Sequence, residues 1–172
     1  NPASLQDLDA LKAQLDAAEA ANQEKQEEID RLREELAGFK RENEVVPETR
    51  DWSEAKTRKM IIDVELRLAG WEPDDENATE YEVTGMPTAS GIGYVDYVLW
   101  GADGKPLALV EAKKTTVDPE VGKQQAKLYA DCLEKMHGQR PIIFYTNGFL
   151  TYLWDDRFYP PRTVAGFYRR EE

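Results

Sequence analysis

The order of elements predicted between residues 93 and 146 constrains the fold more than any other feature of this sequence. Two apolar runs, at about 93–100 and 106–113, flank the segment GADGK, which is typical of a hairpin turn. A third apolar run at 141–146 follows a stretch with helical signals. Because a strand, a helix and a second strand make a unit with parallel strands, we predict an α/β fold, a mixed β-sheet flanked by helices.

Both ends of the helix in this unit carry clear signals. Asp118 is a preferred N-cap residue and Pro119 suits the first helical position, while Gly138 is a typical terminator. The same reasoning predicts three further elements: a helix from Ser53 to Gly70, a short strand near 80–84, and a second hairpin in RPIIFYTNGFLTYLWDD with Asn147-Gly148 at its turn.

The first forty or so residues follow a different pattern. Apolar residues recur at alternating steps of three and four over about five heptads, which indicates a coiled coil. Asn22 occupies an a position, where it favours two strands in a fixed register. We expect residues 1–46 to form a coiled-coil helix and linker that pairs with itself or with another subunit; the alternative is one long helix packed on its own domain. The heptad positions are Leu8, Leu11, Leu15, Ala18, Asn22, Lys25, Ile29, Leu32, Leu36 and Phe39.

A boundary is predicted at Pro47, where the periodicity is lost, so we expect a globular domain at 47–172. The net charge is −12, with 7 Lys+Arg against 13 Asp+Glu in the first fifty residues and 15 against 21 in the rest. Neither part is a basic nucleic-acid surface. This balance argues against a large DNA-wrapping surface, but it does not exclude a site that meets phosphate through a metal.

Cysteine and histidine content excludes several kinds of chemistry. A single cysteine, Cys132, cannot form an internal disulfide and fits a reducing, cytoplasmic location. With one histidine, His137, zinc sites built from Cys and His are excluded by count. We expect Cys132 to be an inert buried thiol and His137 to have a surface or capping role. No apolar run is long enough for a membrane span, and the first residues do not resemble a signal peptide.

Three charged residues interrupt the apolar hairpin: Asp96, Glu111 and Lys113. If the turn centres on GADGK, the numbers of opposed residues sum to about 205, so that Asp96 faces Leu109 and Glu111 faces Tyr94. Side chains alternate along a strand, which places Asp96, Glu111 and Lys113 on one face. Asp96 and Glu111 are then diagonal neighbours, roughly 5–8 Å apart at Cβ.

Two carboxylates at that distance repel each other, and a divalent cation relieves the repulsion. Hard oxygen ligands suit Mg²⁺, which also takes phosphate oxygens, and the backbone carbonyl of Ala112 could be a further ligand. Lys113 would lie beside the metal, where it can steady an attacking water or offset charge on a phosphate. The alternative is a partly exposed strand with a solvated Glu/Lys pair, because D…ExK strings are common.

Asp96, followed by Glu111-Ala112-Lys113 on the next strand, resembles the PD-(D/E)xK nuclease core, with Val95 in place of the motif's Pro. Gln125 and Tyr129, one helical turn apart, match the Q-x-x-x-Y motif that accompanies it. Over residues 48–170, longer segments are similar, in order, to the N-terminal nuclease domain of the R (HsdR) subunit of type I restriction enzymes. They are SEAKTRKMIIDVELRLAGW, GYVDYVLWGADGKPLALVEAKKT, GKQQAKLYAD and IIFYTNG.

The resemblance implies Mg²⁺-dependent hydrolysis of phosphodiester bonds in duplex DNA by a restriction-endonuclease-like core. Asp96 and Glu111 would hold the metal, and Lys113 would position the nucleophilic water. Gln125 and Tyr129 would orient the site or the DNA.

An acid on the preceding helix often completes such sites. Asp63 matches the family's ID pair, so we prefer it to Glu65 as a further metal ligand.

The resemblance also implies partners, namely other restriction–modification subunits and an ATP-driven motor. No G-x-x-x-x-G-K-[ST] phosphate loop occurs here, so we expect a fragment without the motor that delivers DNA to it. Two alternatives stay open: a catalytically silent docking or oligomerisation module with a nuclease fold, and a DNA-repair nuclease with the same core.

Overall fold

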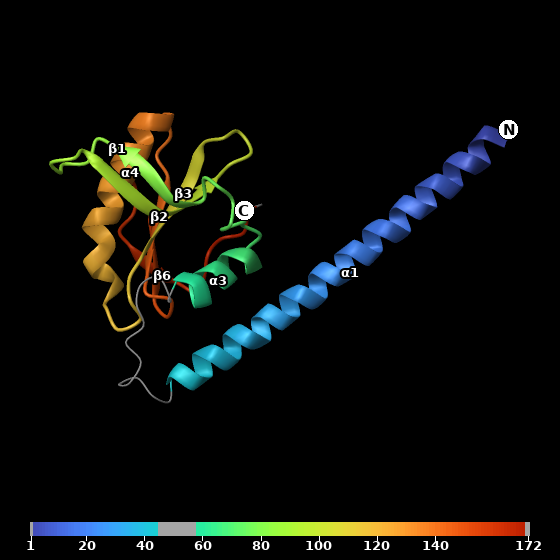
Figure 1. Cartoon of the computed structure of the whole chain (residues 1–172), viewed down its shortest axis with the longest axis horizontal. Helices are drawn as coiled ribbons and strands as arrows, with labels where there is room; N and C mark the ends of the chain where they lie inside the picture. Colours follow the sequence, from blue (N-terminus) through green and yellow to red (C-terminus); the bar gives the residue numbers. More distant parts are fainter. Residues whose placement is uncertain (1, 45–57, 171–172) are drawn as a thin grey trace. The chain divides into compact units, whose positions relative to one another are not determined.

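The structure is a computed structural model that describes residues 2–44 and 58–170. It divides into two compact units, Asn1–Glu42 and Asn43–Glu172, which we describe separately (Figure 1). The boundary predicted at Pro47 and the N-cap predicted at Ser53 lie outside the described residues.

Helix α1, Pro2–Glu44, makes up the first unit as one continuous helix of 43 residues (Figure 1). Leu8, Leu11 and Leu15 are 58–64% exposed, so within this unit the first apolar heptad positions are not buried against other residues. The predicted helix is confirmed, whereas its pairing stays a prediction. None of the helices in the described ranges combines the length and the apolar content needed to cross a bilayer.

Six strands form one sheet in the globular unit, in sequence order from β1 to β6. Strands β3 and β4 are parallel and the other neighbours are antiparallel, which confirms the predicted mixed sheet. Strand β6 was not predicted, because three residues after two prolines carry little strand signal. The strands are β1 Thr79–Thr84, β2 Ile92–Trp100, β3 Pro106–Ala112, β4 Ile142–Thr146, β5 Thr151–Trp154 and β6 Arg162–Val164.

The predicted register of the β2–β3 hairpin is wrong by two residues. Tyr97 pairs with Val110, and the continuation of this register sets Asp96 opposite Glu111 rather than Leu109. The turn centres on Asp103, with Trp100 opposite Pro106, which shifts the register by one residue, and an irregularity between Leu99 and Trp100 adds the second. A shift of two residues preserves the alternation of faces, so Asp96 and Glu111 still belong to the same face.

Helices cover both faces of the sheet (Figure 1). On one face lies α3, Asp63–Leu68, which continues a π-helical turn, η1, at Arg58–Ile62. On the other lies α4, Lys123–His137, preceded by a 3-10 turn, η2, at Pro119–Gly122.

Gly138 ends α4 as predicted, whereas the predicted N-cap, Asp118, belongs to the preceding 3-10 turn, and the N-cap of α4 itself is Gly122. Asp118 Oδ1 accepts a hydrogen bond from the Glu120 amide at 2.9 Å, and Gly138 ends the helix with a φ of 73°. Asp118 therefore caps the 3-10 turn η2, and the α-helix proper begins four residues after Pro119.

Two apolar clusters fill the spaces between the sheet and its helices. The α3 side includes Ile62, Leu66, Tyr97, Val110 and Phe144. The α4 side includes Val83, Leu109, Ala130, Leu133 and Ile143. Because β3 contributes to both clusters, it is buried on both faces, and a charged residue on it has to be accommodated inside the protein.

Candidate functional site

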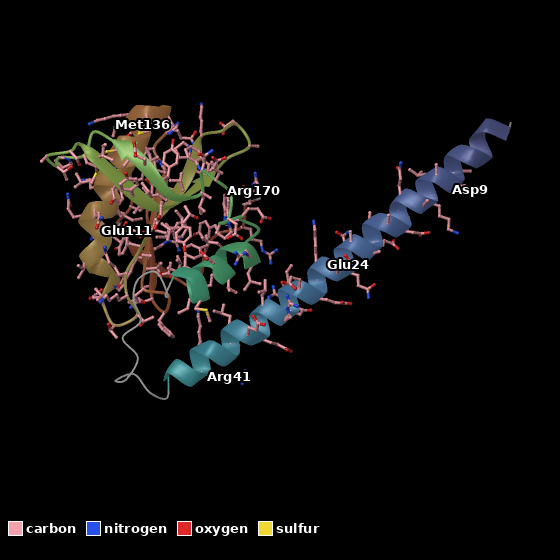
Figure 2. The ribbon with its side chains drawn as sticks, viewed as in Figure 1. Asp9, Glu24, Arg41, Glu111, Met136 and Arg170 are labelled. Carbon is pink, nitrogen blue, oxygen red and sulfur yellow. The ribbon has the colours of Figure 1, made fainter. Side chains whose placement is uncertain are left out.

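The candidate site is built around the C-terminal end of β3. Glu111 is only 3% exposed, and Figure 2 labels it within the globular unit. Its Oε1 lies 2.8 Å from Lys113 Nζ, in an ion pair whose lysine side chain is 14% exposed. A buried carboxylate needs such a partner, because an isolated charge would lose its hydration.

Asp96, on β2, is held against the same strand. The paired residues of β2 and β3 end at Tyr97 and Val110. Just beyond that pair, the Ala112 amide donates a hydrogen bond to Asp96 Oδ2 at 2.7 Å. The Asp96 carboxylate therefore lies beside the peptide that links Glu111 to Ala112.

Helix α4 adds two polar residues to the ion pair. Lys113 Nζ also donates to Gln125 Oε1 at 3.3 Å, and Gln125 Nε2 donates to the Tyr129 hydroxyl at 2.8 Å. These contacts make a continuous chain from Glu111 through Lys113 and Gln125 to Tyr129. The structure thus brings together the residues that were predicted as catalytic on β3 and α4.

Tyr129 remains a neutral phenol in this setting. Burial raises its pKa, the hydrogen bond from Gln125 lowers it, and the negative charges of Glu111 and Asp96 raise it; the net pKa is above the ordinary value. Both acids thus act electrostatically on the same hydroxyl. The ring packs over Gly93, where an added Cβ would lie 2.7 Å from Tyr129 Cε1.

Gly122 is a part of the site that the sequence analysis missed. A Cβ at this position would lie 2.8 Å from Lys113 Cε and 3.0 Å from Glu111 Cγ. Its φ of −83° is open to any residue, so glycine is needed here for space rather than for backbone freedom. The only signal in the sequence is a glycine inside a predicted helix, where a stronger helix former is expected.

Tyr145 supports Glu111 from the neighbouring strand. It pairs with Glu111 across β3 and β4, is fully buried, and donates to Glu120 Oε1 at 2.7 Å. Its ring stacks on Tyr152 with 4.9 Å between centroids. Burial and the hydrogen bond to Glu120 both raise the pKa of Tyr145, so its hydroxyl keeps its proton beside the Glu120 carboxylate.

The backbone of Lys113 is anchored although it lies just past the end of β3. Its amide donates to the Thr146 carbonyl on β4 at 2.8 Å. The parallel pairing of β3 and β4 thus extends by one hydrogen bond to the residue that carries the ammonium group.

Asp63 lies in a different environment. Its Oδ1 accepts a hydrogen bond from the Tyr97 hydroxyl at 2.7 Å, and Tyr97 belongs to the cluster on the α3 side. Within residues 2–44 and 58–170, no three Asp, Glu, His or Cys side chains are grouped so that they could hold a metal ion. Asp63 therefore does not complete a three-acid group with Asp96 and Glu111.

Cys132 and His137 lie outside this chain of contacts. Cys132 belongs to α4 and is 2% exposed, and burial raises the pKa of its thiol. His137 is the last residue of α4 and contacts Tyr81.

Comparison with known proteins supports the resemblance noted from the sequence. The endonuclease subunit of the type I restriction enzyme EcoKI from Escherichia coli (strain K12) is 29% identical, over 54% of this chain and 9% of that subunit. A fragment structure described as an HsdR subunit of a type I restriction enzyme from Vibrio vulnificus YJ016 has the same fold. The match has a TM-score of 0.56 and 24% identity, and covers 72% of this chain and 25% of the other.

No family model matches the chain. The chain spans about 9% of the length of the curated relative and 25% of the solved one. These matches confirm the resemblance to HsdR subunits and the α/β fold; they leave the roles of individual residues untested.

Proposed function

We propose, from the likeness to HsdR subunits in sequence and fold, that this chain is the DNA-cutting domain of a type I restriction enzyme R subunit. Its reaction would be the Mg²⁺-dependent hydrolysis of phosphodiester bonds in duplex DNA. The observation that carries this proposal is the arrangement around β3, where Asp96 binds the amide next to Glu111, and Glu111 pairs with Lys113.

The donor set at this point suits Mg²⁺. The Asp96 carboxylate binds the amide of Ala112, the residue that follows Glu111, and the Ala112 carbonyl belongs to the same segment. The carboxylates of Asp96 and Glu111 and this carbonyl all offer hard oxygen atoms. Mg²⁺ is typically bound by one or two carboxylates, and waters and phosphate oxygens complete its coordination. A bound Mg²⁺ would act as a Lewis acid on the phosphodiester group.

Lys113 would orient the nucleophilic water. Its ammonium group has three donors; two of them are directed to Glu111 and Gln125 in this structure. In the proposed reaction the ammonium group would donate to the attacking water or to a phosphate oxygen, and its positive charge would offset the charge that grows on the phosphate. The buried setting strengthens this electrostatic effect, because little solvent lies between the groups.

Gln125 and Tyr129 have supporting roles. Gln125 bridges Lys113 and Tyr129 through its amide, and it restricts where the ammonium group can lie. Tyr129 is kept neutral by the raised pKa, so it adds no further negative charge near an incoming DNA phosphate.

The partners follow from the same likeness. A net charge of −12 does not favour capture of DNA by this chain alone, so we assign DNA delivery and site recognition to other parts of the restriction–modification enzyme. The heptads of α1 would pair with a second copy or with another subunit.

Metal binding and DNA cleavage test the proposal together. The purified chain is titrated with Mg²⁺ and Mn²⁺ by calorimetry and in thermal melts, and cleavage of duplex DNA with each metal is measured in the complete restriction enzyme that carries this domain. We expect metal to raise the melting temperature and to support cleavage, because binding favours the folded state. Asp96→Asn and Glu111→Gln should each abolish both effects.

Asp63→Asn is the matched control, because it removes an acid that lies outside the arrangement around Asp96 and Glu111. It should leave metal binding unchanged. If the wild-type chain neither binds metal nor supports DNA cleavage in the complete enzyme, the cutting role is wrong, and the silent docking module becomes the better interpretation.

A further inference from the structure

A hollow lies away from Glu111, where the C-terminal end of α4 meets β1 and β2. Its volume is about 520 Å³. Trp100 lies four residues beyond Asp96 on β2, so roughly 13 Å separates their backbones. Figure 2 shows Met136, which precedes His137, at the end of α4 away from Glu111. The residues that matter for its chemistry are Asp75, Glu76, Asn77, Tyr81, Trp100 and His137.

Three aromatic rings form one wall of this hollow. Trp100 packs edge-on against Tyr81 at 5.1 Å between centroids, with an interplanar angle of 71°, and against His137 at 5.0 Å and 79°. Two hydrogen bonds hold them: Tyr81 Oη to His137 Nε2 at 3.2 Å, and Trp100 Nε1 to the Asn77 carbonyl at 2.7 Å. All three rings line the hollow, so a ligand there would lie against an aromatic surface.

The charges around the hollow have one sign. Asp75 and Glu76 lie in the loop that forms its rim, and neither Lys nor Arg is among its described lining residues. Helix α4 ends at His137, so the negative end of its dipole is directed here. The aromatic faces, the two carboxylates and the helix terminus therefore all favour a positive ligand over a neutral or an anionic one.

We propose that this hollow binds a compact organic cation with an alkylammonium head. The aromatic wall would take the head by cation–π attraction, and the carboxylates of Asp75 and Glu76 would offset its charge. Such a head can come from a free polyamine or from a lysine side chain of a protein partner. The proposal does not depend on DNA cleavage, because the hollow shares no residue with the arrangement around Glu111.

Titration of the full chain by ¹H–¹⁵N NMR tests this inference. The Trp100 indole resonance, assigned with Trp100→Phe, reports on the hollow. We expect tetramethylammonium to shift it saturably, and tert-butanol, a neutral molecule of similar shape, to shift it far less. Spermidine and an N-acetyl-lysine amide then distinguish the two sources, and tighter binding of either one identifies the source.

A double variant, Asp75→Asn with Glu76→Gln, keeps the rings and removes both charges. It should weaken tetramethylammonium binding about threefold to tenfold. The matched control, Glu27→Gln with Glu28→Gln, removes two charges from helix α1 and should leave the affinity unchanged. Equal weakening in both double variants, equal shifts by tert-butanol, or the lack of a saturable shift would overturn the proposal.

Discussion

Helix α1 and strand β3 differ in whether their apolar residues are exposed or buried. Leu8, Leu11 and Leu15 on α1 are 58–64% exposed, whereas Leu109 and Val110 on β3 are fully buried. The helix is held by bonds between residues close in sequence, such as Arg31 to Glu28 at 2.5 Å. The strand depends on neighbours far along the chain, from Tyr97 to Phe144.

This difference has a functional meaning. A strand enclosed on both faces can fix a charged group, because Val110, Ala112 and Tyr145 next to Glu111 are buried. A helix with an exposed leucine stripe offers a surface instead, since each leucine gains about 1.5–3 kcal/mol only when it is covered. Under the proposed function, the chemistry belongs to β3 and the assembly to α1, and the following experiments separate the two.

The largest effect is expected from Lys113→Ala in the complete restriction enzyme that carries this domain. Loss of the ammonium group should lower the rate of duplex-DNA cleavage by about 10²–10³-fold, because charge stabilisation at the phosphate is lost. Lys114→Ala, a neighbouring lysine, is the control and should cut at nearly the normal rate. Circular dichroism checks that both variants fold. Normal cleavage by Lys113→Ala would disprove the assigned role.

Deletion of residues 1–46 should act on assembly and not on the metal site. Sedimentation velocity should show a dimer or larger for the full chain and a monomer after the deletion, with metal affinity unchanged. Leu15→Lys, at an a position, should raise the dissociation constant about 100-fold or more, whereas Ala17→Lys on an outer face should not. A full chain that sediments as a monomer would contradict self-association.

A smaller effect is expected from Gly122→Ala. The added methyl group would lie 2.8 Å from Lys113 Cε and 3.0 Å from Glu111 Cγ, so the ion pair has to shift. Cleavage should fall about tenfold, because small displacements of catalytic groups are costly, while the melting temperature changes little. Gly166→Ala, where nothing lies within 4 Å of the new atom, is the matched control. Equal rates for both variants would show that the space at Gly122 does not matter.

The smallest effect is expected from the tyrosine beside the site. Because the pKa of Tyr145 is raised in the folded chain, its contribution to stability is complete below pH 10 and is lost as pH rises further. Tyr145→Phe should therefore reduce the alkaline loss of unfolding free energy by about 1–2 kcal/mol in urea titrations. Tyr159→Phe, which changes a tyrosine that is 70% exposed, should not alter this alkaline loss of unfolding free energy. If the unfolding free energy of Tyr145→Phe fell with rising pH as it does in the wild type, the raised pKa of Tyr145 would be refuted.

Local signals predicted the elements well. Asp118 and Gly138 mark the ends of a helical segment because a cap is formed by residues next to each other in sequence. The hairpin register was less predictable, since it depends on an irregularity at Leu99 and Trp100 that only packing decides. Even so, the shared face of Asp96 and Glu111 was predictable, because alternation tolerates an error of two residues.

Tertiary contacts were beyond the sequence pattern. Asp63 was expected to be near Asp96, but a helix can present an acid to several places, and here that acid meets the Tyr97 hydroxyl. Gly122 was missed because its importance lies in the distance to side chains of another element. Such positions depend on how α4 lies against β3, which no local pattern encodes.

The hydrogen bond from the Lys113 amide to the Thr146 carbonyl has a mechanical consequence. It fixes the main chain of Lys113, while the ammonium group donates hydrogen bonds to Glu111 and Gln125. Under the proposed function, the ammonium group would exchange Gln125 for a DNA phosphate by rotation about its own side-chain bonds alone. The main chain at Lys113 would stay fixed during this exchange of hydrogen-bond partners.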